Sequence, residues 1–429
     1  MIFVLALLAS LLCKLWLATR QMRYVWQHRD QVPAAFVGTV SLQAHQKAAD
    51  YTLAKGRLGL VSLALGSAVL LGWTLLGGLD VLNQFLLNHV HTRWGALPYQ
   101  LSLLVAFSVI GSLIELPLDW YSTFRVEHQF GFNRMSLGLW LADLFKGLLV
   151  GALIGLPLAA LILWIMGTAG TGLDQPWWHA WWFWTWVAWV IFNLTLLVVY
   201  PTLIAPLFNK FQPLSDEPLK ARVQALMQRC GFAAKGLFVM DGSRRSAHGN
   251  AYFTGLGASK RVVFFDTLLQ RLNPGEVEAV LAHELGHFKH KHVFKRMLGI
   301  FAISLAGLAL LGWLAAQSSF YVGLGVLPSV AAPNDALALL LFVLALPPFT
   351  FFTAPLMAQL SRKQEFEADA YACQQSSGHD LARALLKLME DNAATLTPDP
   401  LYVRFYYSHP PASERLAALP TPTPAPAPA

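Results

Sequence analysis

Seven long apolar runs restrict the fold of this 429-residue chain more than any other feature of its sequence. A helix needs about 17–25 apolar residues to cross a bilayer, and each run falls within that range. Because lipid offers no water to satisfy backbone groups, such runs must be helical. The composition agrees, since 55% of the residues are hydrophobic and 13% are charged. We predict transmembrane helices at residues 1–18, 58–79, 97–121, 144–166, 181–205, 297–316 and 336–357.

The basic residues predict how these helices are oriented. The net charge is +7, and Lys and Arg concentrate in the polar segments after the first, third and fifth runs. The segment after the second run holds Arg93 as its only Lys or Arg, and those after the fourth and sixth runs hold neither Lys nor Arg. Since Lys- and Arg-rich loops stay in the cytoplasm, we expect the N-terminus outside and the C-terminus inside. Loop retention also accounts for the basic excess, so we expect the lipid bilayer, and no nucleic acid, as a partner.

Two further sequence features bear on location. The first run lacks a basic start and a convincing cleavage site, which favours an uncleaved anchor over a signal peptide. The Trp-rich stretch at 177–184 is typical of an aromatic belt at the outer interface. No segment resembles an organelle-targeting signal, and the composition is rich in Ala, Leu and Trp. We therefore expect an integral protein of the bacterial inner membrane, with a periplasmic N-terminus.

The polar segments divide the chain into regions. We expect transmembrane helices 1–5 within residues 1–205, including a cytoplasmic loop at 19–57. A cytoplasmic domain follows, and after it come the last two transmembrane helices, a further polar segment and a Pro/Ala-rich disordered tail. These later regions are predicted at residues 206–296, 297–357, 358–419 and 420–429, respectively.

The HExxH motif at residues 283–287 carries the strongest chemical signal. His283 and His287 are four residues apart, so both imidazoles lie on one helical face and can bind one Zn²⁺. Glu284 between them is placed to take a proton from water at the metal. The alternative is a zinc-free helix in which these histidines are ordinary core or surface residues.

The start of the HExxH helix is also readable. Asn273 is suited to the N-cap, Pro274 to the first helical position, and Glu276 to the third position of a capping box. We predict a helix from there to about His292.

A catalytic zinc needs a third protein ligand, and the segment around Glu365 supplies it. Glu365 and Asp369 are four apart and share a helical face, so Glu365 would bind zinc while Asp369 orients a zinc-bound histidine or assists protonation. The last two transmembrane helices form a hairpin that returns the chain to the same membrane face, which explains the long gap from His283. A solvated carboxylate in a mixed run is the alternative for Glu365.

Three neighbouring residues are given weaker roles. His290 and His292 continue the histidine-rich stretch, and we interpret them as mainly structural, with a regulatory metal site as the alternative. Glu367 lies off the face shared by Glu365 and Asp369, so we predict that it is solvated.

Several motifs together resemble the type I integral-membrane CAAX prenyl proteases, seven-span zinc endopeptidases related to the HtpX proteases. The resemblance covers about residues 1–419 and has the order of motifs found in that family. The matching segments are 127–133 (EHQFGFN), 200–211, 245–255, the HExxH at 283–287, the Glu365–Asp369 module, and 408–411 (SHPP) with Arg415.

The resemblance implies a fold and further site residues. The fold class is an α-helical polytopic membrane protein with seven transmembrane helices around an intramembrane chamber. It carries a gluzincin-like HExxH zinc protease domain with a small β-hairpin. By the same resemblance, Asn250 and Ala251 would bind substrate, and His409 and Arg415 would hold the substrate or the oxyanion.

The residues themselves leave alternatives for these positions. Residues 250–255 and 261–266 have the pattern of a hairpin, whose free edge could accept an extended peptide or could be only structural. His409 before two prolines could be a turn residue, and Arg415 alone could be a solvated helix charge.

The predicted function is a membrane-integral zinc-dependent endopeptidase with one Zn²⁺ per chain. Its substrate would be a peptide or protein, prenylated or embedded in the membrane. Catalysis would use Glu284 as base, with Asp369, His409 and Arg415 assisting. A bacterial quality-control protease for membrane proteins is one alternative. A non-catalytic peptide-binding or transport protein is another, although Glu115 and Asp119 form no charged relay across the bilayer.

Overall fold

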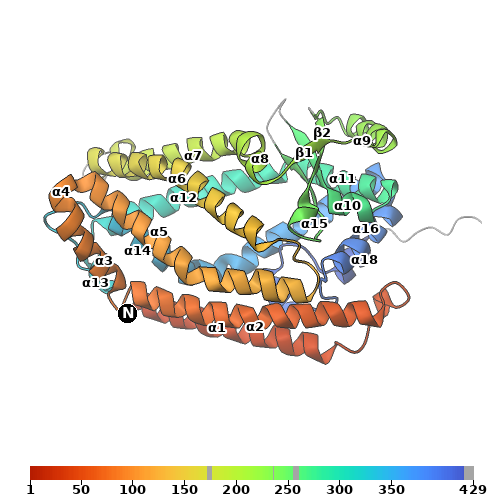
Figure 1. Ribbon diagram of the computed structural model, residues 1–429, viewed down its shortest axis with the longest axis horizontal. Coiled ribbons are helices and arrows are strands. Elements are labelled where there is room, and N and C mark those ends of the chain that lie inside the picture. Colours follow the sequence, from red (N-terminus) through yellow and green to blue (C-terminus); the bar gives the residue numbers. More distant parts are fainter. Residues whose placement is uncertain (172–175, 235, 255–259, 420–429) are drawn as a thin grey trace, which may run out of the picture.

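The computed structural model describes residues 1–171, 176–234, 236–254 and 260–419. The predicted tail at 420–429 and residues 255–259 of the predicted hairpin lie outside these residues. Helices dominate the described chain, and a small sheet lies at one end of the long helices (Figure 1).

Seven helical segments of the described chain are long and apolar enough to cross a membrane, which confirms the predicted number. Their surfaces carry exposed apolar side chains, such as Phe145 and Leu153, as expected for helices that face lipid. Four of the seven are single helices: Ile2–Gln27 (α1), Leu42–Trp73 (α2), Leu137–Thr168 (α6) and His292–Ala315 (α12). The segment Ala96–Glu127 consists of α5 (Ala96–Tyr121) and a π-helical turn, and Trp181–Phe208 consists of α7 (Trp181–Val199), a π-helical turn and α8 (Ala205–Phe208). The last segment, Asp335–Gln375, contains α14 (Asp335–Thr350) and α15 (Ala354–Gln375).

The helices extend well beyond the apolar runs, because a helix satisfies its own backbone groups in water as well as in lipid. The segment 19–57, predicted as a loop, is therefore mostly helical, and only residues 28–41 connect α1 to α2. Arg29 joins this connection to α2, because its Nε and Nη2 donate to the two carboxylate oxygens of Asp50 at 2.7 and 2.8 Å.

Short helices close the other end of the bundle (Figure 1). There Gln100 accepts a hydrogen bond from the Ala336 backbone at 2.9 Å, which joins α5 to the start of α14. In the Trp-rich stretch, Trp177, Trp178 and Trp184 are exposed, whereas Trp181 is buried in the bundle core. The short helices are α3 (Gly78–Leu86), α4 (Thr92–Trp94) and α13 (Ser318–Gly323).

The sheet has four strands in the order β1-β2-β4-β3. The predicted hairpin is present as β3 (Ala251–Thr254) and β4 (Arg261–Phe265), which pair antiparallel. The sequence analysis missed β2 (Gly236–Met240), parallel to β4, and the short β1 (Phe211–Pro213), antiparallel to β2. Strand β3 is thus at the edge of the described sheet.

Residues 206–296 and 358–419 share one hydrophobic core, although the last two membrane helices separate them in sequence. The core joins the sheet to α9, α10, α11, α15 and α16, with Leu416 and Leu419 at the C-terminal end. The helices beyond the membrane spans are α9 (Glu217–Arg229), α10 (Asp266–Arg271), α11 (Pro274–Lys289), α16 (Gly378–Asp391), α17 (Pro400–Tyr406) and α18 (Ala412–Ala418).

Cavities open among the membrane helices, and two of them adjoin. One of about 590 Å³ lies between α2, α5 and Leu344 of α14. The other, of about 630 Å³, lies towards the polar ends of α1, α2 and α5. Leu58 and Leu118 line both cavities, so the two adjoin. Most lining side chains are apolar, which suits an apolar occupant.

Candidate metal centre

Helix α11 positions the HExxH motif, and its start is fixed by the predicted capping box. Asn273 Oδ1 accepts from the Glu276 backbone, and Glu276 Oε2 accepts from the Asn273 backbone, both at 2.9 Å. Glu276 is buried and its carboxylate also accepts from Lys387 Nζ of α16 at 2.7 Å. These contacts fix the rotation of α11 relative to its neighbours, and so the direction of its histidines.

Gly286 allows α11 to approach α15 closely. A Cβ atom at this position would lie 2.9 Å from Ala368 Cα and 3.0 Å from the Ala368 carbonyl oxygen. Backbone atoms cannot yield as a flexible side chain can, so only glycine permits this separation. The close approach brings the carboxylate of Glu365 on α15 to the histidines of α11.

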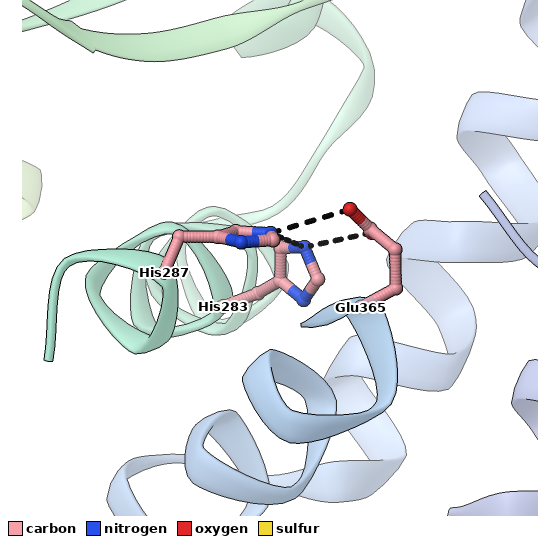
Figure 2. Close-up of side chains that lie close together, drawn as sticks. All are labelled: His283, His287 and Glu365. Atoms are coloured by element: carbon pink, nitrogen blue, oxygen red, sulfur yellow. Dashed lines mark hydrogen bonds and ion pairs between the residues drawn. The ribbon is translucent and has the colours of Figure 1, made fainter. Parts of the chain in front are cut away.

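His283, His287 and Glu365 come together at this contact (Figure 2). The Nε2 atoms of the two histidines are 3.2 Å apart. Glu365 Oε2 lies 3.4 Å from His283 Nε2, and Glu365 Oε1 lies 3.4 Å from His287 Nε2. Ligands at the usual Zn–N and Zn–O distances of about 2.0–2.2 Å in a tetrahedral site are separated by about 3.3 Å. The three residues therefore match the ligand spacing of one zinc ion.

Two observations support a cation at this position. Glu365 is only 3% exposed, and its Oε2 atom has no hydrogen-bond partner among the described residues. Burial by itself lowers the pKa of His283, but the nearby carboxylates of Asp369 and Glu365 outweigh burial and raise that pKa to about 9. The two carboxylates thus favour positive charge at His283, which a divalent ion beside it would supply.

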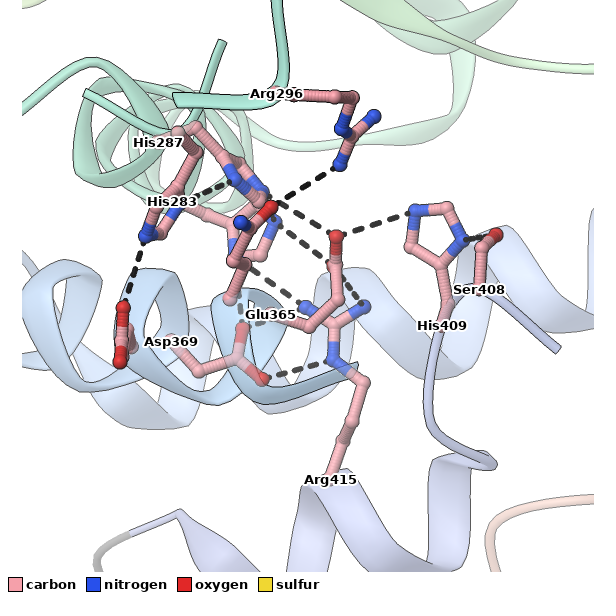
Figure 3. A network of polar contacts seen from close by, with 11 residues as sticks. His283, His287, Arg296, Glu365, Asp369, Ser408, His409 and Arg415 are labelled. Atoms are coloured by element: carbon pink, nitrogen blue, oxygen red, sulfur yellow. Dashed lines mark hydrogen bonds and ion pairs between the residues drawn. The ribbon is translucent and has the colours of Figure 1, made fainter. Parts of the chain in front are cut away.

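Asp369 and Arg415 surround the cluster (Figure 3). Asp369 Oδ1 accepts from His283 Nδ1 at 2.8 Å, which leaves Nε2 facing the cluster. Arg415 Nε donates to Asp369 Oδ2 at 2.8 Å, and its Nη1 lies 3.8 Å from Glu365 Oε2. Arg415 is buried, so the alternative of a solvated helix charge is wrong.

His409 and Glu284 complete the surroundings of the cluster. His409 Nε2 lies 3.4 Å from Glu365 Oε1, and its Nδ1 is 3.0 Å from Ser408 Oγ. The His409 side chain is largely exposed, so it remains accessible to a bound molecule. Burial raises the pKa of the Glu284 carboxyl, which the nearby Glu365 raises further. Such a carboxylate is a better base than an ordinary exposed one.

The residues expected to bind substrate lie on the sheet edge beside α11. Ala251 begins β3 and is buried, whereas Asn250 precedes the strand and is exposed. Asn250 Oδ1 accepts from the Ala251 backbone at 2.8 Å, and its carbonyl accepts from the Phe265 backbone at 3.0 Å. Strand β3 contacts α11, the helix that carries His283 and His287.

The structure corrects the predicted end of the HExxH helix. Helix α11 ends at Lys289, and α12 begins at His292. Lys291 between them has φ +56°, in the left-handed region that only a few per cent of non-glycine residues adopt. The chain therefore turns where a continuous helix was expected.

This turn creates contacts that the sequence analysis missed. His292 is buried, and its Nδ1 lies 3.0 Å from His287 Nδ1. Glu367 is not a free solvated charge, because its Oε2 lies 2.9 Å from His292 Nε2. The dense run of histidines was the available signal, but it could not indicate which of them are adjacent.

Comparisons with known proteins agree with these observations. Residues 21–210 match the model of the CAAX prenyl protease N-terminal region with five membrane helices, and residues 213–423 match peptidase family M48. Among curated relatives, the chain is 33% identical to CAAX prenyl protease 1 homolog of Arabidopsis thaliana over 90% of both chains. It is 31% identical to the human homolog over 98% of this chain and 95% of the other.

A solved structure has the same architecture. The crystal structure of S. mikatae Ste24p superposes with a TM-score of 0.86 at 29% sequence identity, and the match covers 98% of this chain and 99% of that one.

Proposed function

The chain belongs to peptidase family M48 as a relative of the CAAX prenyl proteases, and we propose that it cleaves prenylated CAAX-type or other membrane-associated peptides. Family membership makes it a membrane zinc metalloendopeptidase. The observation that carries the site assignment is the mutual spacing of 3.2–3.4 Å between the facing atoms of His283, His287 and Glu365.

One Zn²⁺ per chain would be held by His283, His287 and Glu365. When bound, zinc acidifies a water molecule and polarises the scissile carbonyl group. Two histidines and one carboxylate are the ligand set of many catalytic zinc sites that keep one position for water.

The protein residues would supply the proton transfers and the orientation. Glu284 would take a proton from the attacking water and return it to the leaving amine, with Asp369 as the alternative donor. Asp369 accepts from His283 Nδ1, which keeps Nε2 directed at the metal position. His409 lies near one oxygen of the Glu365 carboxylate and Arg415 near the other, and both could stabilise negative charge on the reacting carbonyl oxygen (Figure 3).

The substrate peptide would bind beside α11 as an added strand. The free edge of β3 offers backbone groups to an extended peptide, and Asn250 and Ala251 lie where it starts. An apolar part of the substrate would occupy the adjoining cavities between α1, α2 and α5, whose linings are mostly apolar. The linings of these two cavities contain none of the metal-centre residues, so the apolar part and the scissile bond would bind in separate places.

The orientation also follows from the basic loops. The N-terminus would face away from the cytoplasm, and the metal centre and C-terminus would lie on the cytoplasmic side. The curated relatives that cover most of the chain include plant, yeast and human proteins. These comparisons do not favour the bacterial alternative, and they give no support to a bacterial inner membrane.

Cleavage of a farnesylated CAAX peptide by the purified protein tests this proposal. We expect activity that a zinc chelator abolishes, and a loss of about 10²–10⁴-fold in Glu284→Gln, the range that general acid–base catalysis contributes. The exposed Glu414 of α18 offers a matched control, since Glu414→Gln should keep full activity.

The other outcomes separate the alternatives. Full turnover in Glu284→Gln would exclude Glu284 as the base. Bound zinc without cleavage of the prenylated peptide would direct the search to unprenylated membrane peptides. If the protein neither binds zinc nor cleaves peptide, the non-catalytic alternative would hold.

A further inference from the structure

A second group of metal-binding side chains lies beside the proposed zinc site. It comprises His290, His292 and Glu367, and one ligand atom from each lies within 4.8 Å of the others. We call this group the turn cluster, because its histidines flank the turn between α11 and α12. None of its members has a role in the proposed hydrolysis.

The turn at Lys291 is what assembles this cluster. In a continuous helix, residues two apart point in different directions and do not face each other. The left-handed conformation of Lys291 breaks the helix, so the rings of His290 and His292 lie 5.4 Å apart and within 14° of parallel. Glu367 joins them from α15, two residues after the proposed zinc ligand Glu365.

We propose that the turn cluster is a second binding site for zinc or a similar divalent transition-metal ion. Two imidazoles and one carboxylate are ligands that such ions prefer. His292 Nε2 and Glu367 Oε2 are 2.9 Å apart, close to the separation of about 3.3 Å between ligands in a tetrahedral zinc site. His292 and Glu367 are thus nearly in place, and His290 must move to complete the site.

The surroundings permit that movement. His290 is exposed at the end of α11, so its ring can turn towards the other two ligands. The Glu367 side chain is 36% exposed, which leaves a position for water. Lys363 Nζ is 3.9 Å from Glu367 Oε1, and its largely exposed side chain can move away when a metal binds.

The turn cluster is coupled to the proposed zinc site through a direct contact. His292 Nδ1 lies 3.0 Å from His287 Nδ1, and a hydrogen bond between two ring nitrogens requires that only one of them carries the proton. His287 bound to zinc through Nε2 would carry that proton and donate it. A metal on His292 Nε2 would place a proton on His292 Nδ1 as well, so two N–H groups would face each other.

A metal bound at the turn cluster should therefore displace the His287 ring from its position as a zinc ligand, so excess zinc should inhibit the enzyme. This consequence rests on the proposed catalytic zinc, whereas the binding of a metal by the turn cluster does not.

Metal stoichiometry tests the site directly. Protein without a histidine tag would be stripped with chelator, dialysed against Zn²⁺ and analysed by mass spectrometry of the metal. We expect two ions in the native protein and one in each of Glu365→Gln and Glu367→Gln, with His290→Ala also losing one. His379→Ala removes an exposed histidine of α16 and should retain two ions.

The variants distinguish failure of this inference from failure of the proposed function. One ion in the native protein and none in Glu365→Gln would overturn the turn-cluster site and leave the catalytic zinc intact. Two ions in Glu367→Gln would also overturn it. Turnover at rising zinc gives a second readout, since inhibition by excess zinc should disappear in His290→Ala, and its persistence there would exclude the coupling.

Discussion

The proposed zinc site and the turn cluster use the same residue types, two histidines and one glutamate, but the fold assembles them differently. In the zinc site, a continuous helix places His283 and His287 on one face, and its separation from α15 is set at Gly286. In the turn cluster, a break in that helix brings together histidines that a helix would direct apart. Helical periodicity thus gives a buried, closely spaced set, whereas the turn gives a partly exposed one.

The difference shows in the carboxylates. Glu365 is 3% exposed and lies 3.4 Å from both histidines, whereas the Glu367 side chain is 36% exposed and contacts only His292 of its pair. Preorganisation of this kind is what a catalytic metal requires, because a displaced ligand misplaces the reacting groups. A looser site binds metal more weakly and is better suited to regulation.

The largest contrast should come from replacing the carboxylate of each cluster, Glu365 or Glu367, by an amide. Glu365→Gln should reduce peptidase activity by more than the roughly 100-fold that outer partners of metal ligands contribute, because it removes a ligand itself. Glu367→Gln at low zinc should cost much less activity, because Glu367 reaches the zinc ligand His287 only through His292. Peptide cleavage assays on both variants measure this contrast, and equal losses would show that the two clusters act as one site.

Loss of the carboxylate behind His283 should have the next largest effect. Asp369→Asn keeps the shape but weakens the acceptor for His283 Nδ1, so zinc affinity or activity should fall about 10–100-fold. Zinc competition with a fluorescent chelator gives the affinity. Glu367→Gln, which alters the acceptor of His292 instead, is the matched control, and an equal loss of catalytic zinc there would remove the distinction between the clusters.

A substitution that pushes α11 away from α15 should disturb the zinc site next most strongly. A methyl group in Gly286→Ala would meet the Ala368 backbone, and overpacking of this kind costs about 1–3 kcal/mol. We expect a lower thermal denaturation midpoint in detergent and weaker zinc retention. Gly299→Ala in α12, where a Cβ atom meets nothing within 4 Å, should show neither change. Unchanged zinc retention in Gly286→Ala would show that this contact does not set the ligand spacing.

The smallest effect should come from the turn itself. Lys291→Gly removes the penalty of a left-handed side-chain residue and should stabilise the protein by up to about 1 kcal/mol. Both clusters should keep their metals. Lys291→Val resists that conformation, so it should lower metal binding at the turn cluster more than at the zinc site. Metal analysis of the two variants checks this prediction. Equal losses of metal at both sites in Lys291→Val would contradict it.

Features encoded by neighbouring residues were predictable from the sequence. The seven membrane helices follow from the length of apolar runs, and the start of α11 follows from Asn273, Pro274 and Glu276. The pairing of His283 with His287 follows from helical periodicity. The hairpin of β3 and β4 also follows from local pattern, but β1 and β2 did not, because they pair only with distant strands.

Other features depend on contacts between distant segments. Arg415 was readable only as a helix charge, and its burial against Asp369 depends on the docking of α18 to α15. The segment 19–57, predicted as a loop, is mostly helical, because polar residues indicate where a helix leaves the lipid but do not indicate where the helix itself ends.

The sequence by itself therefore determined that seven helices of this chain can cross a membrane and that His283 and His287 share one helical face. Both properties are local, since they depend on hydrophobicity and on spacing along one helix. The tertiary structure alone decided that residues 206–296 and 358–419 form one core, that Gly286 sets the distance to Glu365, and that His292 touches His287. These properties depend on how separate segments pack, and close packing is specified by the complete set of neighbours in space.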